Sequence, residues 1–138
     1  MKNIFTILLT IMIIIIFNSC NKDVSNTKLD LIQNMIVNKT WYLDYSILGN
    51  KTQSYVGQST YFITYLKNKT TKDSDVLNCI FSIVENNGKF ILIVNTKTFN
   101  GNNLSYSNTI ESVGDMKMIQ SYISTGKTEK TMLYFTSK

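Results

Sequence analysis

The hydrophobic pattern divides the chain into three parts. Residues 4–17 form one long apolar run without a charge, and residues 29–37 repeat apolar side chains at helical spacing. From residue 40 onward, apolar and polar side chains alternate. A period of 3.6 residues indicates an amphipathic helix, whereas a period of two is typical of strands with one buried face. The pattern therefore predicts a leader segment, one short helix and a β domain.

The leader is too short to span a bilayer. Its fourteen residues, all apolar except Thr6 and Thr10, would rise roughly 21 Å as a helix, whereas the hydrocarbon core is about 30 Å thick. Lys2 precedes the run, and Asn18 and Ser19 follow it. A positive start, a short apolar run and small residues before a break are typical of a secretory signal peptide. The sequence therefore predicts export.

Residues 17–20 (Phe-Asn-Ser-Cys) resemble the lipobox of bacterial lipoproteins. Ser19 fits that pattern, whereas Phe17 and Asn18 stand where the family usually has Leu and a small residue. The resemblance implies cleavage after residue 19 and lipidation of Cys20. Acyl chains contribute about 0.8 kcal/mol per buried methylene, so three chains would hold the protein on a membrane. The alternative is an ordinary secreted protein with a Cys near its cleavage site.

Residues 21–23 (Asn-Lys-Asp) loosely resemble the short signals that send some lipoproteins to the cell surface. The alternative is a solvated tether. Together with the lipobox, this resemblance implies a bacterial cell-envelope protein of the outer membrane, with surface exposure as an option. We expect a signal peptide over residues 1–19, a tether over residues 20–28 and a single domain over residues 29–138.

The domain is expected to be all-β after its helix over residues 29–37. Asn87 and Gly88 give the strongest hairpin signal, because a type I′ turn needs positive φ at both positions. Gly57 is expected to break a stretch that is too long for one strand, and residues 68–75 are expected to form a polar loop. The expected strands cover residues 40–48, 53–66 with the break at Gly57, 76–84, 89–95, 104–113, 116–124 and 130–136.

These segments amount to about eight strands joined by tight turns, an antiparallel up-and-down meander. Closing such a meander into a barrel removes its two exposed edges. A short helix, then Trp41 on the first strand (residues 38–43, Asn-Lys-Thr-Trp-Tyr-Leu), then the meander resembles lipocalin-like domains of bacterial lipoproteins. The resemblance implies a lipocalin-like barrel. A looser barrel or a sandwich is the alternative.

Three departures from that family are visible in the sequence. Lys39 stands where the family has a Gly, two positions before Trp41. The family covers this Trp with an Arg from the last strands, and in this chain Lys127 or Lys130 would have to serve. No helix follows the last strand in the sequence given.

The composition argues against catalysis and nucleic-acid binding. All basic residues are Lys, with a net charge of +5 for the full sequence, and there is neither His nor Arg. Arg is the usual bidentate partner of phosphates and bases, and His is the commonest general base and metal ligand. Cys79 lies among apolar neighbours and is expected to be a buried, inert thiol. We expect no enzyme, no cofactor, no metal site and no nucleic-acid partner.

Aromatic side chains are the remaining functional signal. Eight Tyr occur in the sequence, and aromatic side chains line ligand cavities in barrels, although they also fill packed cores. The first hypothesis is a small apolar ligand or an envelope partner bound by the anchored barrel. The alternative is a structural or accessory subunit of an envelope complex with a packed core. The candidate residues for a cavity or core are Trp41, Tyr45, Tyr61, Tyr65, Phe81, Tyr106, Tyr122 and Tyr134.

Overall fold

The computed structural model describes residues 27–73, 79–97 and 100–138, which form a closed antiparallel barrel with one helix. The expected signal peptide, Cys20 and most of the tether lie outside these residues. The elements are α2 (Lys28–Ile36), β1 (Thr40–Leu48), β2 (Lys51–Ser54), β3 (Phe62–Tyr65), β4 (Thr70–Asp73), β5 (Cys79–Asn86), β6 (Lys89–Lys97), β7 (Asn103–Val113), β8 (Lys117–Ile123) and β9 (Lys130–Ser137).

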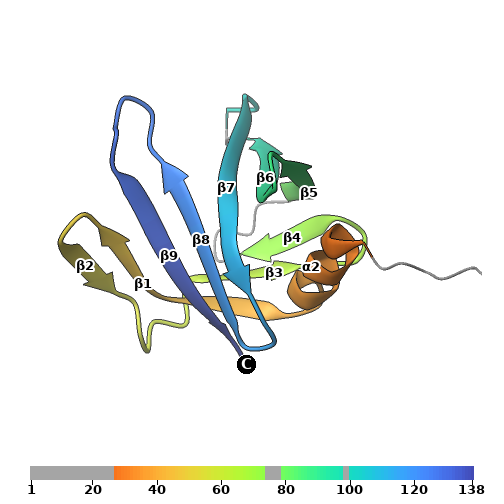
Figure 1. The fold of residues 1–138 in the computed structure, drawn as a ribbon, viewed down its shortest axis with the longest axis horizontal. Coiled ribbons are helices and arrows are strands. Elements are labelled where there is room, and N and C mark those ends of the chain that lie inside the picture. The colour runs from red at the N-terminus through yellow and green to blue at the C-terminus, as the bar shows by residue number, and fades with distance from the viewer. Residues whose placement is uncertain (1–26, 74–78, 98–99) are drawn as a thin grey trace, which may run out of the picture.

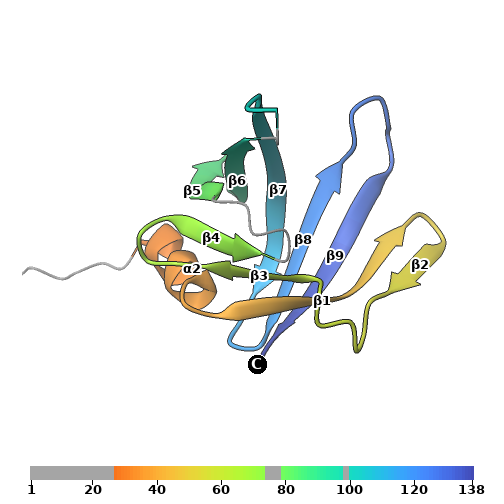
Figure 2. The same cartoon turned by 180° about the vertical axis from the view of Figure 1, so that it is seen from behind.

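Eight of the nine described strands close the ring. The ring runs β1-β3-β4-β5-β6-β7-β8-β9 and returns to β1 through the β1–β9 pairing. The ninth, β2, forms a hairpin with the second half of β1, while the first half of β1 pairs with β3. Figures 1 and 2 show this ring from its two sides. The predicted all-β, eight-stranded meander barrel with a short N-terminal helix is confirmed.

One predicted loop is wrong. Residues 70–73, expected within a polar loop, form β4, which pairs with β3 on one side and β5 on the other. The segment contains two Thr, whose β-branched side chains suit a strand, and Thr71 is buried in the barrel interior. The predicted break at Gly57 is confirmed, because it lies in the connection between β2 and β3 with a φ of 83°.

Helix α2 begins at a capping box that the sequence reading did not identify. The Thr27 hydroxyl accepts a hydrogen bond from the backbone N–H of Asp30, and the Asp30 carboxylate accepts one from the backbone N–H of Thr27. Such boxes satisfy two N–H groups that the first turn leaves without partners. The helix ends where Val37 becomes extended and Asn38 takes a positive φ of 61°.

The two ends of the barrel differ. We call the end covered by α2, which carries the β3–β4, β5–β6 and β7–β8 turns, the closed end. The other end, with the β1–β2 and β8–β9 turns, is the open end. In Figure 1 the helix lies at the right, and the two open-end turns lie at the left. The predicted Asn87-Gly88 turn joins β5 and β6 at the closed end, with φ values of 51° and 73°.

The core fills the closed end and the middle of the barrel. It consists of buried apolar side chains from the helix and from most ring strands, with Leu29, Ile32 and Val37 packed against them. These buried members are Ile36, Trp41, Tyr65, Cys79, Phe81, Ile83, Phe90, Leu92, Val94, Ile110, Met118 and Phe135.

Candidate functional site

The inner wall of the open end carries large apolar side chains that are not covered. Tyr122 and Leu48 lie opposite Thr131, which is buried, and Tyr106 lies opposite the buried Val94. Directly paired residues share one face of a sheet, so these side chains face the interior, yet they are 37–42 % exposed. Leu104, opposite the buried Thr96, is 48 % exposed. The interior is therefore open to solvent at this end.

A hydrogen-bonded chain of polar side chains crosses the barrel below this open region. Gln120 on β8 accepts a hydrogen bond from the Asn108 Nδ2 group on β7 at 2.8 Å. Its own Nε2 group donates to the Tyr65 hydroxyl on β3 at 3.4 Å. All three side chains are buried. We call Tyr65, Asn108 and Gln120 the polar floor, because along β7 and β8 the two amides lie between the core residues Ile110 and Met118 and the open end.

Two buried hydroxyl groups lie beside the floor without a partner. Thr71 and Thr96 are 3 % and 9 % exposed, and neither Oγ1 atom has a hydrogen-bond partner. Thr71 lies directly between Tyr65 on β3 and Cys79 on β5. Buried polar groups are normally paired with protein, water or a ligand. These two hydroxyls therefore supply unused hydrogen-bonding capacity in the wall next to the floor.

The Tyr106 phenol stays neutral over the whole physiological pH range. Burial raises its pKa to about 12, and the nearby Cys79 and Asp73 act in the same direction. Burial also raises the pKa of Tyr65 far above its usual range, although the Gln120 hydrogen bond opposes this. Both phenols are therefore available as neutral hydrogen-bond donors.

One inward-facing acidic residue lies near the floor. Asp73 lies opposite Ile63 on β3, and its carboxylate is 3.9 Å from the Cys79 Sγ atom. No Lys occupies an inward-facing position on the ring strands that the structure describes. The region thus offers hydroxyl, amide and phenol groups but no cation to a bound molecule.

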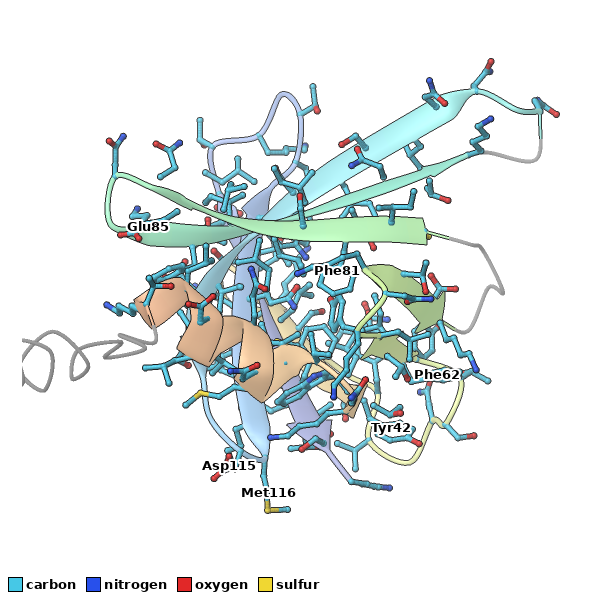
Figure 3. The ribbon with its side chains drawn as sticks, turned by 90° about the vertical axis from the view of Figure 1, so that its right-hand side faces the viewer. Tyr42, Phe62, Phe81, Glu85, Asp115 and Met116 are labelled. Atoms are coloured by element: carbon cyan, nitrogen blue, oxygen red, sulfur yellow. The ribbon has the colours of Figure 1, made fainter. Side chains whose placement is uncertain are left out.

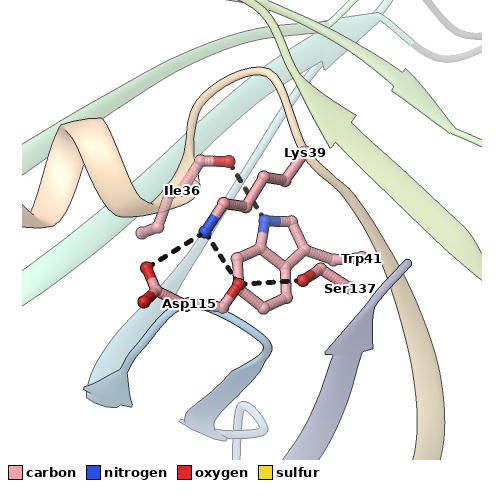
Figure 4. Close-up of polar contacts among 5 residues, drawn as sticks. All are labelled: Ile36, Lys39, Trp41, Asp115 and Ser137. Atoms are coloured by element: carbon pink, nitrogen blue, oxygen red, sulfur yellow. Dashed lines mark hydrogen bonds and ion pairs between the residues drawn. The ribbon is translucent and has the colours of Figure 1, made fainter.

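The closed end is sealed around Trp41. Its side chain is fully buried, and its indole Nε1 donates to the backbone carbonyl of Ile36 at 3.0 Å. The Lys39 Nζ atom lies 5.8 Å from the indole ring centroid and donates to the backbone carbonyl of Asp115 at 2.7 Å (Figure 4). The expectation that Lys127 or Lys130 would cover the Trp is wrong, because Lys39 lies over it. Lys130 instead pairs with Glu111 at 2.6 Å.

The predicted aromatic set is divided by the fold. Trp41, Tyr65 and Phe81 are buried in the core, and Tyr106 and Tyr122 face the open end. Tyr61 lies just before β3 and packs against Tyr55 in a tilted arrangement, with ring centroids 4.7 Å apart, so it belongs to the β2–β3 connection. The remaining two lie on the outer face.

Tyr45 and Tyr134 form a stacked pair outside the barrel, with ring centroids 4.4 Å apart. Their placement follows from a β-bulge at Asp44, because Leu43 lies opposite Phe135 but Tyr45 lies opposite Tyr134. The extra residue moves Tyr45 to the face opposite that expected from strict alternation. Strict alternation along residues 40–48 predicts that Tyr45 shares one face with Trp41 and Leu43, and this prediction is wrong from residue 45 onward.

An outer groove of about 490 Å³ runs beside this stacked pair. Its lining combines aromatic, aliphatic and charged side chains of β1, β8 and β9. They include Asp44, Tyr45, Lys117, Ile119, Tyr134 and Thr136.

The sequence reading missed the polar floor and the two unpaired hydroxyls. Asn108 and Gln120 could have been noticed as amides on otherwise apolar faces of their strands, which is unusual for inward positions. Thr71 gave no such signal, because β4 was not predicted. Asn108 and Gln120 lie on adjacent strands, but the contact between Gln120 and Tyr65 joins residues 55 positions apart in the sequence.

The described residues contain no group of three potential metal ligands and no helix long and apolar enough to cross a membrane. Cys79 is a buried free thiol. Comparisons of the chain with protein-family models, with curated proteins and with solved structures found no match.

Proposed function

We propose that this chain is a lipid-anchored envelope protein, held by Cys20, whose lipocalin-like barrel binds a small amphipathic molecule at its open end. The observation that carries the binding proposal is the exposure of inward-facing Leu104, Tyr106 and Tyr122 above a buried polar floor. Apolar walls with a few oriented polar groups are typical of small-molecule sites. The proposed location is the bacterial outer membrane.

The polar groups favour an uncharged head group over a carboxylate. Thr71 and Thr96 can donate or accept hydrogen bonds, whereas no Lys on the described ring strands faces inward to pair with an anion. A buried anion without a paired cation is costly. The favoured ligand is thus an aliphatic chain that ends in a hydroxyl or another neutral polar group.

A binding assay needs a reporter at the open end, because Trp41 lies in the closed end beneath Lys39. A Tyr122→Trp variant places an indole in the proposed wall. The matched control is Val56→Trp in the β2–β3 connection, where the native side chain is 70 % exposed. Dodecanol should change the emission of Tyr122→Trp and leave Val56→Trp unchanged. An unchanged Tyr122→Trp signal across a panel of neutral amphiphiles would contradict the proposal.

The anchor is tested separately. Cells given a palmitate analogue should incorporate it into the chain, and Cys20→Ser should abolish incorporation. Membrane fractionation of the same two proteins should place the native chain with outer membranes and release the variant. Incorporation into Cys20→Ser would contradict lipidation at this residue.

The outer groove supports a second candidate function, that of an accessory subunit of an envelope complex. Its stacked Tyr45–Tyr134 pair and its mixed charges suit a protein surface, since aromatic side chains are enriched at interfaces. A photocrosslinker at Ile119, in the outer groove, should capture one stoichiometric partner in cells if this function holds. The same label at Leu104 is the control. No adduct from position 119 would contradict it.

A further inference from the structure

We propose that the closed end of the barrel docks on the membrane surface and that a groove between α2 and strands β6 and β7 receives the head group of an anionic phospholipid. This inference rests on the lipid anchor proposed above for Cys20. It fixes the orientation of the domain, with the open end facing away from the membrane.

The groove combines apolar walls with two ammonium groups. It measures about 440 Å³, and its apolar lining includes Leu31, Ile32, Met35, Phe90 and Val113. Lys28 and Lys89 also line it, and the Lys28 Nζ atom lies 5.5 Å from the Phe90 ring centroid. Leu31 is 45 % exposed. Apolar walls and cations in one groove fit an amphiphile with an anionic head group.

The one carboxylate in the lining is already engaged. Glu111 accepts hydrogen bonds from the Lys130 Nζ atom at 2.6 Å and from the Ser121 hydroxyl at 2.5 Å. These contacts hold the pKa of the Glu111 carboxyl below its usual range, so it remains ionised but is compensated by Lys130. Lys28 and Lys89 therefore dominate the field at the groove.

The tether joins the domain at this groove. Seven residues separate Cys20 from Lys28, and an extended chain covers at most about 3.5 Å per residue, so the tether reaches at most roughly 28 Å. Lys28 is both the first helical residue and part of the groove lining. An anchor at Cys20 therefore holds the closed end within reach of the membrane.

Other exposed groups at the closed end suit the same surface. Met116, at the β7–β8 turn, is 66 % exposed beside Asp115 (Figure 3). The charges facing this end are mostly positive, because Asp30 is held in the capping box and Asp115 pairs with Lys39 at 3.7 Å. The lysines here are Lys28, Lys39, Lys67, Lys69, Lys89, Lys117 and Lys138, against Asp30, Glu85, Glu111 and Asp115.

Vesicle binding by the mature chain with Cys20→Ser tests the surface without the anchor. The chain should bind vesicles of phosphatidylglycerol and phosphatidylcholine, and bind pure phosphatidylcholine much more weakly. A Lys near an anionic surface contributes about 1 kcal/mol, or about fivefold in affinity. Lys28→Gln and Lys89→Gln should each lower affinity by about that factor. Lys51→Gln and Lys127→Gln, at the open end, are the matched controls.

Equal losses from the closed-end and open-end variants would overturn the proposal, because binding would then follow net charge alone. Equal affinity for the two vesicle types would also overturn it. Circular dichroism of each variant checks that its β content is unchanged, which these exposed positions lead us to expect.

The orientation is tested on the anchored protein. A fluorophore on Met116→Cys should be quenched by a quencher attached to lipid head groups, and one on Lys127→Cys should not be quenched. Similar quenching at both positions would overturn the orientation. If palmitate labelling shows that Cys20 carries no lipid, the anchor in the proposed function fails, while the vesicle experiment still decides whether the closed end binds anionic lipid.

Discussion

The closed and open ends of this barrel are built from the same strands but differ in how far their inward-facing side chains are buried. At the closed end, Trp41 and Ile36 are fully buried, and α2 and Lys39 cover them. At the open end, Tyr106 and Leu104 face inward and remain two-fifths to one-half exposed. Burial of apolar surface is the main favourable term in folding, so stability is concentrated at the closed end and the other end is left available for binding.

The polar floor marks the boundary between the two ends. Met118 and Phe135 pack in the core on its closed side, and the unpaired hydroxyls of Thr71 and Thr96 lie in the wall beside it. A barrel of eight strands has an interior that side chains can fill or that can hold one small ligand. The difference between the ends can be tested by substitutions that affect one end and spare the other.

Trp41→Ala should have the largest effect. Removing a fully buried Trp costs about 3–5 kcal/mol, since it leaves a cavity in the core. Tyr122→Ala at the open end is the matched control and should cost less than half as much, because its side chain is already 37 % exposed. Urea unfolding of both variants measures the comparison. Equal losses would contradict the assignment of stability to the closed end.

Gln120→Leu should have the next largest effect. It removes the partner of the Asn108 Nδ2 group, and an unpaired buried donor costs about 1–3 kcal/mol. The double variant Asn108→Leu with Gln120→Leu should recover part of this loss, because no amide is then left without a partner. Chemical unfolding measures both. If the double variant lost as much unfolding free energy as the two single variants together, the Asn108 and Gln120 side chains would not be coupled, which would contradict this prediction.

Tyr106→Phe should change how steeply the free energy of unfolding falls as the pH rises in base. The folded pKa of Tyr106 is raised to about 12 from an ordinary value of 10, so its contribution is fully present below pH 10. It is lost as pH rises from 10 to 12, because the unfolded chain releases this proton first. The variant should lose stability less steeply over that window and run parallel to the native chain below it. Parallel curves throughout would contradict the raised pKa of Tyr106.

Glu111→Gln should have the smallest effect. The Lys130 and Ser121 contacts lower the Glu111 pKa, so its contribution is present above the ordinary value of 4.5 and is lost as pH falls below it. Exposed pairs contribute roughly 0.2–1 kcal/mol, and Glu111 is 30 % exposed. Thermal unfolding at neutral pH and in acid measures the difference, which should vanish in acid and shrink at high salt. A loss that persists in acid would contradict the ion pair.

Some features could be predicted because they depend on neighbours in the sequence. Asn87 and Gly88 require a tight turn wherever they occur between strands, and the spacing of Leu29, Ile32 and Ile36 requires a helix. Trp41 was assigned to the interior for the same reason, since it begins an alternating segment. The bulge at Asp44 could not be predicted, because it depends on the register of β9, ninety residues away.

The sequence by itself determined an all-β domain with a short helix, because alternation with period two and the turn residues leave few other solutions. Only the tertiary structure decided that polar residues 70–73 complete the ring as β4, that Lys39 covers Trp41, and that Tyr45 points outward. Only the packing of β8 against β3 brings Gln120 to Tyr65. The physical reason is that the register of β1 against β9 and the contact of Gln120 with Tyr65 join strands far apart in the chain, and no local pattern specifies such a pairing.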